Sequence, residues 1–300
     1  MALDADQLID ELARVLKTGA RSGDDLRTSM GRWLNMAFRS IAYFAAWDGM
    51  RDEQVIATVA AYSTGTATFT LNSATVTGSG TTWTAAMVGR KIARTQGGIY
   101  YRVATYVSAT QITIAEVYAE ATASASTYVI YQDEYDLATT THSIESANLI
   151  DAYGGPELIG TEQRYMDRYG FSPAFTGRPF AYSVATSTTV GTPRIRLTPT
   201  PDAIYRISFR YLKTWTTITG SDLYTAQGLP EDVEELAIDR ALRWAPRIQG
   251  SRAVMPDLAW RRALREVWVA HKTRRYPVGQ RHGLTEAHGP TIVFNAGGLS

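Results

Sequence analysis

The sequence predicts an α+β protein: a helical body with an inserted small all-β module (a sandwich or barrel) and an extended C-terminal arm. Three observations lead to this fold class. Apolar residues recur at helical spacing near both ends of the chain. Residues 65–131 are rich in Thr and Ala, carry few charges and alternate as half-buried strands do. Residues 276–300 are rich in glycine and show no apolar periodicity, which is typical of an extended arm.

These patterns divide the chain into four parts. Residues 1–64 are predicted to form the N-terminal helical part of the body, and residues 65–131 the inserted β module. Residues 132–275 are expected to supply the β hairpins and C-terminal helices of the body, and residues 276–300 the arm.

Two helices are expected at the N-terminus. In residues 6–17, apolar side chains recur at helical spacing and acidic residues occupy the first turn. Residues 22–48 have a cap-like start, Ser22-Gly-Asp-Asp. The apolar stripe of this second helix is wide, so the helix is expected to be buried on more than one side.

The β module begins with an alternating strand, Thr66 to Leu71, followed by a tight turn at Asn72-Ser73. Further short strands are expected at residues 91–93, 100–106, 111–115 and 128–131. Turns at residues 97–98 and 108–110 would connect them as hairpins.

The part after residue 132 mixes strands and helices. Strands are expected at residues 147–153, 177–184, 193–197 and 204–212, with a short helix at 161–169. Residues 229–247 read as a helix with proline near its first turn and a break at Pro246. Residues 257–274 form the last predicted helix, with Leu258, Leu264 and Trp268 facing inward.

Composition excludes several classes of protein. The chain contains no cysteine, so it has no disulfides and no cysteine-based metal site. We expect no membrane span, because no apolar run approaches the required length. The acidic N-terminus lacks the positive start of a signal peptide.

The net charge is only +1, but the charge is unevenly distributed and the C-terminal region is strongly basic. We expect its cations to meet an acidic protein surface or the phosphates of DNA, because the arginine fork pairs with carboxylate and phosphate. The alternative is a solvated helix face paired within the chain. Sequence-specific DNA recognition is not indicated, since no recognition-helix motif or zinc-finger spacing is present. The candidate contact residues are Arg261, Arg262, Arg265, Lys272, Arg274 and Arg275.

The C-terminal arm contains one apolar segment, which includes Ile292, Val293 and Phe294. It has the pattern of an anchor that orders on assembly, and the alternative is a disordered terminus.

Catalytic chemistry is not indicated, and we expect no enzyme, no cofactor and no metal site. The histidines are scattered without metal-ligand spacing. The acidic run from Glu231 to Glu235 reads as the start of a helix rather than a pair of catalytic carboxylates. No phosphate-binding loop or dinucleotide fingerprint is present.

The N-terminal helical pair and four later segments, taken in order, resemble a known family. The segments are Gly177-Arg-Pro-Phe-Ala-Tyr182, the segment from Ile195 to Ala203 (Ile-Arg-Leu-Thr-Pro-Thr-Pro-Asp-Ala), Tyr205-Arg-Ile-Ser-Phe-Arg-Tyr211, and Leu229-Pro-Glu-Asp-Val-Glu-Glu-Leu-Ala-Ile-Asp-Arg-Ala-Leu242. This order resembles the head-to-tail adaptor proteins of tailed bacteriophages, a group that includes the tail tubular protein A or gatekeeper type. The 65–131 module resembles β modules found in many phage structural proteins.

The resemblance implies a structural protein of the virion neck, assembled in the host cytoplasm. It implies a ring of this chain, a dodecamer, between the portal protein and the tail nozzle or tube, with double-stranded DNA passing non-specifically through the lumen. A tail fibre is a further expected partner. The basic helix face and the arm would then contact the portal.

The alternative hypothesis is a tail-fibre or receptor-binding component whose β module binds host glycan. In that case Trp83, Tyr100, Tyr101 and Tyr106 should form an exposed aromatic platform.

Overall fold

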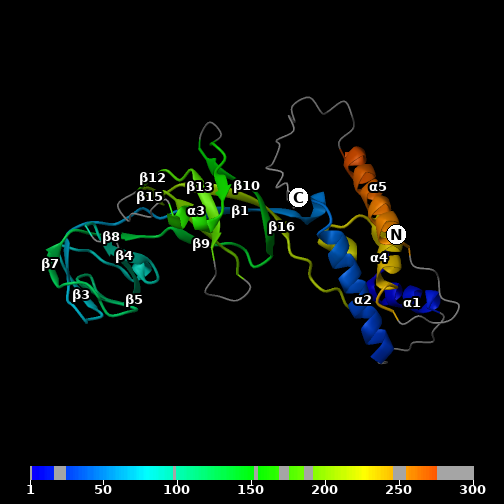
Figure 1. Cartoon of the computed structure of the whole chain (residues 1–300), viewed down its shortest axis with the longest axis horizontal. Coiled ribbons are helices and arrows are strands. Elements are labelled where there is room, and N and C mark those ends of the chain that lie inside the picture. The colour runs from blue at the N-terminus through cyan, green and yellow to red at the C-terminus, as the bar shows by residue number, and fades with distance from the viewer. Residues whose placement is uncertain are drawn as a thin grey trace, which may run out of the picture. The chain divides into compact units, whose positions relative to one another are not determined.

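The computed structural model describes residues 2–16, 25–96, 99–151, 155–168, 176–185, 192–245 and 255–275, with side chains up to Lys272 in the last range. Its contacts divide the chain into two compact units (Figure 1). Unit 1 combines Met1–Met50 with Trp215–Ser300, and unit 2 is Arg51–Thr214. The first unit is helical and the second is built from strands.

Unit 1 is a small helical bundle formed by both ends of the chain. Its helices are α1 (Ala5–Val15), α2 (Asp25–Ala42), α4 (Glu234–Ala241) and α5 (Asp257–Arg275), with short 3-10 helices η1 (Asp48–Met50), η3 (Tyr224–Gln227) and η4 (Glu231–Val233). The Asp4 side chain caps α1 by accepting a hydrogen bond from the Gln7 backbone amide at 2.8 Å, and the Gln7 side-chain oxygen accepts one from the Asp4 backbone amide at 3.0 Å. This capping box fixes where the first helix starts.

The core of unit 1 lies between α2 and the C-terminal segment. Phe38 of α2 is fully buried and stacks on Tyr224 and Trp215, with ring centroids 4.8 and 5.6 Å away. Leu34, Ala37 and Ile41 continue the buried stripe of α2, which packs against α4. Aromatic stacking of this kind stabilises by about 0.5–1.5 kcal/mol beyond simple burial.

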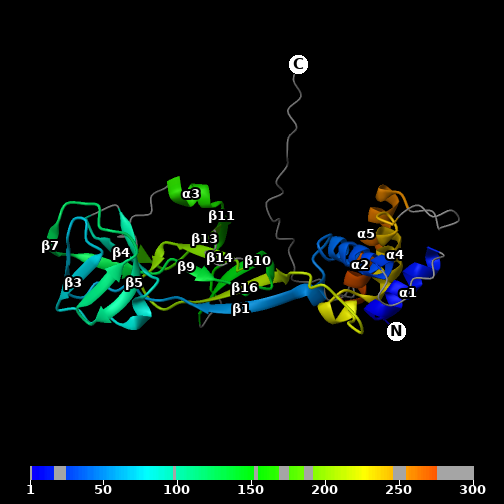
Figure 2. The same ribbon diagram turned by 90° about the horizontal axis from the view of Figure 1, so that it is seen from below.

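Unit 2 contains one large curled sheet with its own core (Figure 2). Its seven strands, in spatial order, are β7 (Ala123–Ser126), β2 (Thr66–Phe69), β3 (Thr75–Ser79), β6 (Gln111–Ile114), β5 (Tyr100–Ser108), β4 (Lys91–Arg94) and β8 (Tyr128–Tyr131). All the pairings are antiparallel. Phe69, Val76, Trp83 and Ile112 are among the fully buried side chains that fill the curl.

Three smaller sheets complete unit 2. The first, a three-stranded sheet, has the order β1 (Arg51–Ala57), β16 (Arg206–Lys213), β10 (Thr141–Ile150). The second, a four-stranded sheet, has the order β11 (Ile159–Thr161), β13 (Ala181–Ala185), β14 (Arg194–Thr198), β9 (Glu134–Asp136). The third pairs β12 (Thr176–Gly177) with β15 (Thr200–Pro201). The short helix α3 (Gln163–Arg168) contacts β13. Residues from β14 and β16, among them Leu197, Ile207 and Phe209, share one core between the first two sheets.

The predicted fold class, a helical body with an inserted β module, is wrong. The structure is mostly β, with 35% of residues in strands against 30% in helices, and a large curled antiparallel sheet. The main reason is that residues 132–214, which the sequence assigns to the helical body, form sheets in the same strand-built unit as residues 65–131. In addition, β1 begins with the polar run Arg51-Asp-Glu-Gln and lacks the alternation that marks a strand in sequence. Its strand conformation comes from pairing with β16, whose residues lie far along the chain. The predicted C-terminal arm lies outside the described residues.

Two glycines let distant segments of unit 1 touch through their backbones. Gly228 follows η3 with φ of +99°, a conformation that favours glycine. A Cβ atom at Gly228 would lie 2.1 Å from the carbonyl of Gly49. The contact joins the end of the N-terminal segment to the connection between η3 and η4, and no side chain can be accommodated there.

We expect Gly228→Ala to lower the free energy of unfolding of unit 1 by about 2–5 kcal/mol, because it combines left-handed strain with a backbone clash. Gly220→Ala is the matched control: φ there is +59° but nothing lies within 4 Å of the added Cβ, so only strain of about 1–2 kcal/mol applies. Chemical denaturation followed by tryptophan fluorescence measures both. Equal losses for the two variants would contradict the close backbone contact.

Candidate functional site

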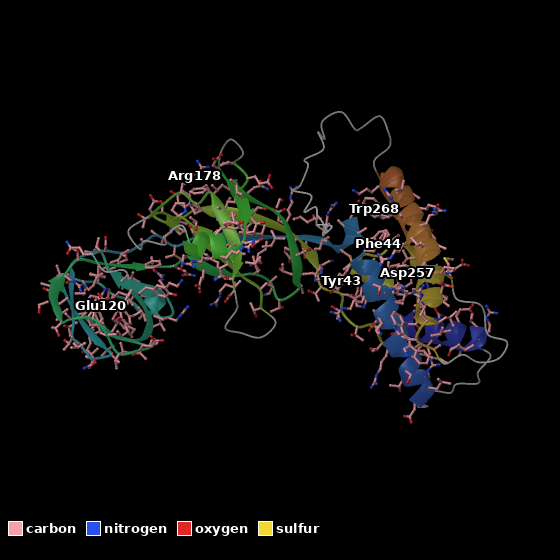
Figure 3. All side chains as sticks on the ribbon, in the orientation of Figure 1. Tyr43, Phe44, Glu120, Arg178, Asp257 and Trp268 are labelled. Carbon is pink, nitrogen blue, oxygen red and sulfur yellow. The ribbon has the colours of Figure 1, made fainter. Side chains whose placement is uncertain are left out.

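Helix α5 is anchored to unit 1 along one side. Trp260 and Leu264 are buried, and the Trp260 indole nitrogen donates a hydrogen bond to the Leu236 carbonyl at 2.9 Å. The Arg240 guanidinium lies 4.6 Å from the centre of the Trp260 ring and 2.7 Å from the Asp257 carboxylate. Figure 3 places Asp257 and Trp268 at different heights along the same helix. These contacts fix which side of α5 faces solvent.

The opposite side of α5 combines arginines with exposed apolar groups. Arg261, Arg262 and Arg265 are exposed there, as are Leu258 (83% exposed) and Val269. The three arginines and Leu258 line an open hollow of about 520 Å³. We call Leu258, Arg261, Arg262, Arg265 and Val269 the basic face of α5.

The charges on this face are only partly neutralised. Arg261 lies 2.9 Å from Asp257, and hydrogen bonds from Arg261 and Arg240 hold the pKa of that carboxyl below its ordinary value. Among the described residues, no carboxylate pairs with Arg262 or Arg265. This face therefore carries positive charge that is available to a partner.

The structure brings together only part of the predicted contact set. Arg261, Arg262 and Arg265 share the basic face, and Lys272 lies two turns further on, with its ammonium 4.5 Å from the centre of the Trp268 ring. The side chains of Arg274 and Arg275 and the arm residues Ile292, Val293 and Phe294 lie outside the described part of the chain.

The expectation that Leu258 faces inward is wrong. The inward line of α5 runs through Trp260 and Leu264. Leu258 lies two residues before Trp260, about 200° around the helix, and therefore points to the opposite side.

A second charged group lies where the chain leaves the seven-stranded sheet. Lys91 of β4 and Asp133 of the β8–β9 connection are almost completely buried, and their charged atoms lie 2.9 Å apart. Arg196 of β14 contacts the same carboxylate at 3.0 Å. One buried aspartate thus connects the seven-stranded sheet to the four-stranded sheet.

Glu134 and Asp136 extend this group. Glu134 lies 2.6 Å from Lys91 and within 3.5 Å of Arg102 and Arg194, while Arg194 also contacts Asp136 at 2.6 Å. A cavity of about 180 Å³ adjoins these side chains. We call the set the ion cluster, and it consists of Lys91, Arg102, Asp133, Glu134, Asp136, Arg194 and Arg196.

Sequence reasoning missed the ion cluster, although a signal was present. Lys91 opens the strand Lys-Ile-Ala-Arg next to two apolar residues that fill both faces, and a cation buried at such a position needs a partner. The acidic residues Asp133, Glu134 and Asp136 follow directly after the last strand of the module. The pairing itself was not visible, because Arg194 and Arg196 come from a different sheet about 60 residues later in the chain.

The aromatic platform expected for glycan binding is not assembled. Trp83 and Tyr101 are buried, and the Trp83 indole donates a hydrogen bond to the Tyr128 hydroxyl at 2.9 Å. Tyr100 and Tyr106 are exposed, and the Lys91 ammonium lies 4.7 Å from the centre of the Tyr100 ring. Two of the four aromatic residues therefore belong to the core.

Within the described ranges, no group of three histidine, aspartate or glutamate side chains is arranged to hold a metal ion. No helix among the described residues is long and apolar enough to cross a membrane. A comparison with protein-family models and with curated proteins finds no match to this sequence.

We expect Lys91→Met to lower the free energy of unfolding of unit 2 by about 3 kcal/mol, because it leaves the buried Asp133 with one cation instead of two. Arg102→Gln is the control: its side chain is 41% exposed and its pair with Glu134 is long, so the loss should stay below about 1 kcal/mol. Urea unfolding followed by circular dichroism compares the two. Equal losses of unfolding free energy in the two variants would show that the buried pair stabilises unit 2 no more than the exposed pair does.

Acid should weaken the ion cluster. Burial raises the pKa of Glu134, but hydrogen bonds and charges from Lys91 and Arg102 outweigh this, and the pKa lies below its ordinary value of 4.5. The stabilisation is therefore complete above that value and is lost as the pH falls through the lower, folded-state pKa.

We expect the urea midpoint of unit 2 to fall between pH 5 and pH 3, and to fall less in the Glu134→Gln variant. Glu116→Gln, which removes an exposed carboxylate of the same unit, should keep the full decline. Parallel declines in both variants would rule out a role for Glu134.

Proposed function

We propose that this chain is a structural virion protein: a head-to-tail adaptor of a tailed bacteriophage. It forms a ring between the portal and the tail nozzle or tube and surrounds the DNA channel. The observation that carries the proposal is the basic face of α5, which has the composition of a protein-binding surface.

The composition of this face favours a protein partner over a solvated surface. Arginine is enriched at protein interfaces, where it combines bidentate pairing with apolar contact. Here Arg262 and Arg265 lack a carboxylate partner among the described residues, and Leu258 is 83% exposed beside them. An acidic portal surface with an apolar centre would satisfy both features.

Three of the segments that carry the family resemblance contribute residues to the interior. Ile195 and Leu197 of β14 share one core with Ile207 and Phe209 of β16. Leu229 is buried at the start of the segment that leads into η4 and α4. Residues with such roles define a fold, so the resemblance concerns the fold of the proposed adaptor.

In this proposal the basic face of α5 contacts the portal, and the C-terminal arm, with Ile292, Val293 and Phe294, docks beside it. Twelve copies form the ring, DNA passes through its lumen without sequence recognition, and unit 2 meets the nozzle, the tube or a tail fibre. The protein assembles in the host cytoplasm and resides in the neck of the virion.

The glycan-binding alternative loses its main support, because Trp83 and Tyr101 are core residues. A receptor-binding component of that kind would need a different exposed surface on the seven-stranded sheet.

Electron microscopy of the assembled particle tests the proposal. We expect a twelve-subunit ring of this chain directly beneath the portal, and a trimeric spike at the tail tip would contradict the adaptor function. In particles carrying Arg262→Glu with Arg265→Glu, we expect occupancy of the ring position to fall at least about tenfold, since each lost charged contact weakens binding by about 1.5–3 kcal/mol.

Arg210→Glu provides a matched control, because Arg210 is an exposed arginine of unit 2. It should leave occupancy unchanged if portal contact depends on the basic face of α5. Loss of occupancy in this control alone would assign the contact to unit 2 instead.

A further inference from the structure

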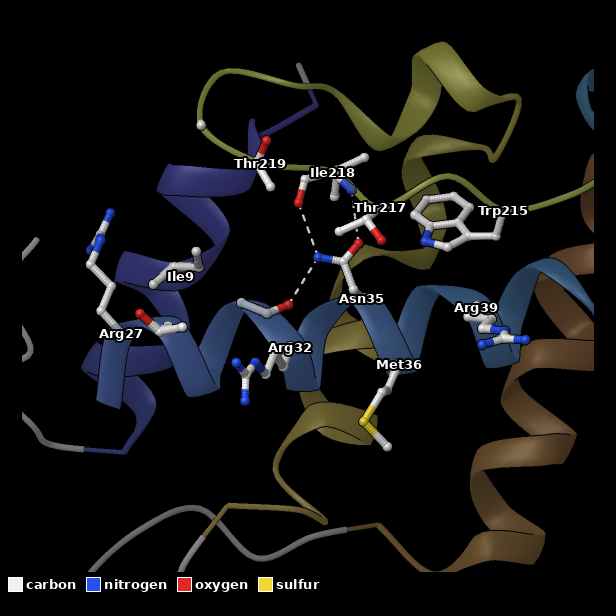
Figure 4. A pocket seen from close by; sticks show the side chains of 13 residues that line it. Ile9, Arg27, Arg32, Asn35, Met36, Arg39, Trp215, Thr217, Ile218 and Thr219 are labelled. Atoms are coloured by element: carbon white, nitrogen blue, oxygen red, sulfur yellow. Dashed lines mark hydrogen bonds between the residues drawn. The ribbon is translucent and has the colours of Figure 1, made fainter. Parts of the chain in front are cut away.

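A groove runs along one face of α2 in unit 1. Arg32, Met36 and Arg39 line it from the helix, and Trp215 and Ile218 from the segment opposite (Figure 4). Its volume is about 640 Å³ and it is open to solvent. Met36 is 45% exposed, so the groove offers an apolar contact between two arginines.

The far wall of the groove is fixed in place by Asn35. Its side-chain nitrogen donates to the Ile218 carbonyl at 3.0 Å, and its oxygen accepts from the Ile218 amide at 2.9 Å. The Trp215 amide donates to the Tyr43 hydroxyl at 3.1 Å. Because these bonds hold the wall without any partner, the groove is preformed.

The groove is positively charged. Arg27, at one end, is neutralised by Asp6 and Asp10. Arg32 and Arg39 have no carboxylate partner within the described residues, and Arg39 lies over the Tyr43 ring at 5.7 Å. A segment that enters the groove should therefore supply carboxylates.

Unit 1 has exposed carboxylates on a surface other than the groove. Glu231, Asp232 and Glu235 are exposed where η4 passes into α4, and we call them the acidic edge. Glu231 and Asp232 each have a further interaction within the chain. A carboxylate has about four acceptor positions, so an exposed one can still pair with a second cation. Helix α4 packs on the buried stripe of α2, which includes Leu34 and Phe38.

The groove and the acidic edge of one copy face different ways. At 100° per residue, Arg32, Met36 and Arg39 lie on roughly the opposite side of α2 from the stripe that contacts α4. The two surfaces of one chain are therefore directed away from each other, but two copies can bring them together.

We propose that the groove on α2 binds the acidic edge of a second copy of this chain. Arg32 and Arg39 pair with its carboxylates, and Met36 provides the apolar contact between them. The contact joins two different surfaces, so it is head-to-tail, and repetition of such a contact closes a ring when the rotation permits. The inference rests on the proposed adaptor function and identifies the interface that would build the ring.

Disulfide trapping tests the contact directly, because the chain has no cysteine of its own. Full-length Met36→Cys and Glu235→Cys variants are mixed in equal amounts and oxidised, so that a mixed disulfide can form only between two copies. We expect at least about five times more mixed dimer than from Val269→Cys with Glu235→Cys, which pairs the edge with the exposed side of α5. Equal or greater yield from that control pair overturns the proposal.

Charge exchange separates a specific contact from misfolding. Adding Arg32→Glu and Arg39→Glu to the Met36→Cys chain should lower the mixed dimer about tenfold. Adding Glu231→Arg and Asp232→Arg to the Glu235→Cys chain should restore it. Loss without restoration contradicts pairing between these charges.

The two hypotheses fail separately. A twelve-subunit ring beneath the portal without the mixed disulfide refutes the groove contact and leaves the adaptor function standing. The mixed disulfide without such a ring refutes the adaptor function and leaves the groove contact standing.

Discussion

The buried carboxylate of Asp133 is the interaction on which the arrangement of unit 2 depends. It contacts Lys91 from the seven-stranded sheet and Arg196 from the four-stranded sheet, at the short connection where the chain passes from β8 to β9. A charge buried this deeply is costly unless it is paired, because desolvation otherwise exceeds the gain from pairing. The two sheets are thereby linked through one buried carboxylate.

Sequence reasoning was most successful where a segment's own pattern decides its structure. Thr66 to Phe69 alternates and forms β2, and Ile207 and Phe209 are buried as the alternation of their strand predicted. Sequence reasoning failed where the conformation of a segment depends on a partner strand far along the chain. The polar start of β1 gives no strand signal, and its conformation follows from pairing with β16.

The candidate surfaces also contain features that the local sequence predicts and features that depend on packing. Arg261, Arg262 and Arg265 could be selected from sequence because charge density is visible there. The exposure of Leu258 beside them could not, since it depends on which side of α5 Trp260 and Leu264 bury. The groove on α2 could not be predicted from sequence, because its walls come from Met36 and from Ile218, which are far apart in the chain.

The discontinuity of unit 1 has a consequence for biosynthesis. Phe38 packs on Trp215 and Tyr224, so the apolar stripe of α2 stays uncovered until the C-terminal residues leave the ribosome. At about 5–20 residues per second, on the order of ten to thirty seconds separate the synthesis of Ala42 from that of Trp215. The hairpins of the seven-stranded sheet form from neighbouring segments and can fold during this interval. During this interval the nascent chain therefore has a β unit that can complete its core and a helical unit that cannot.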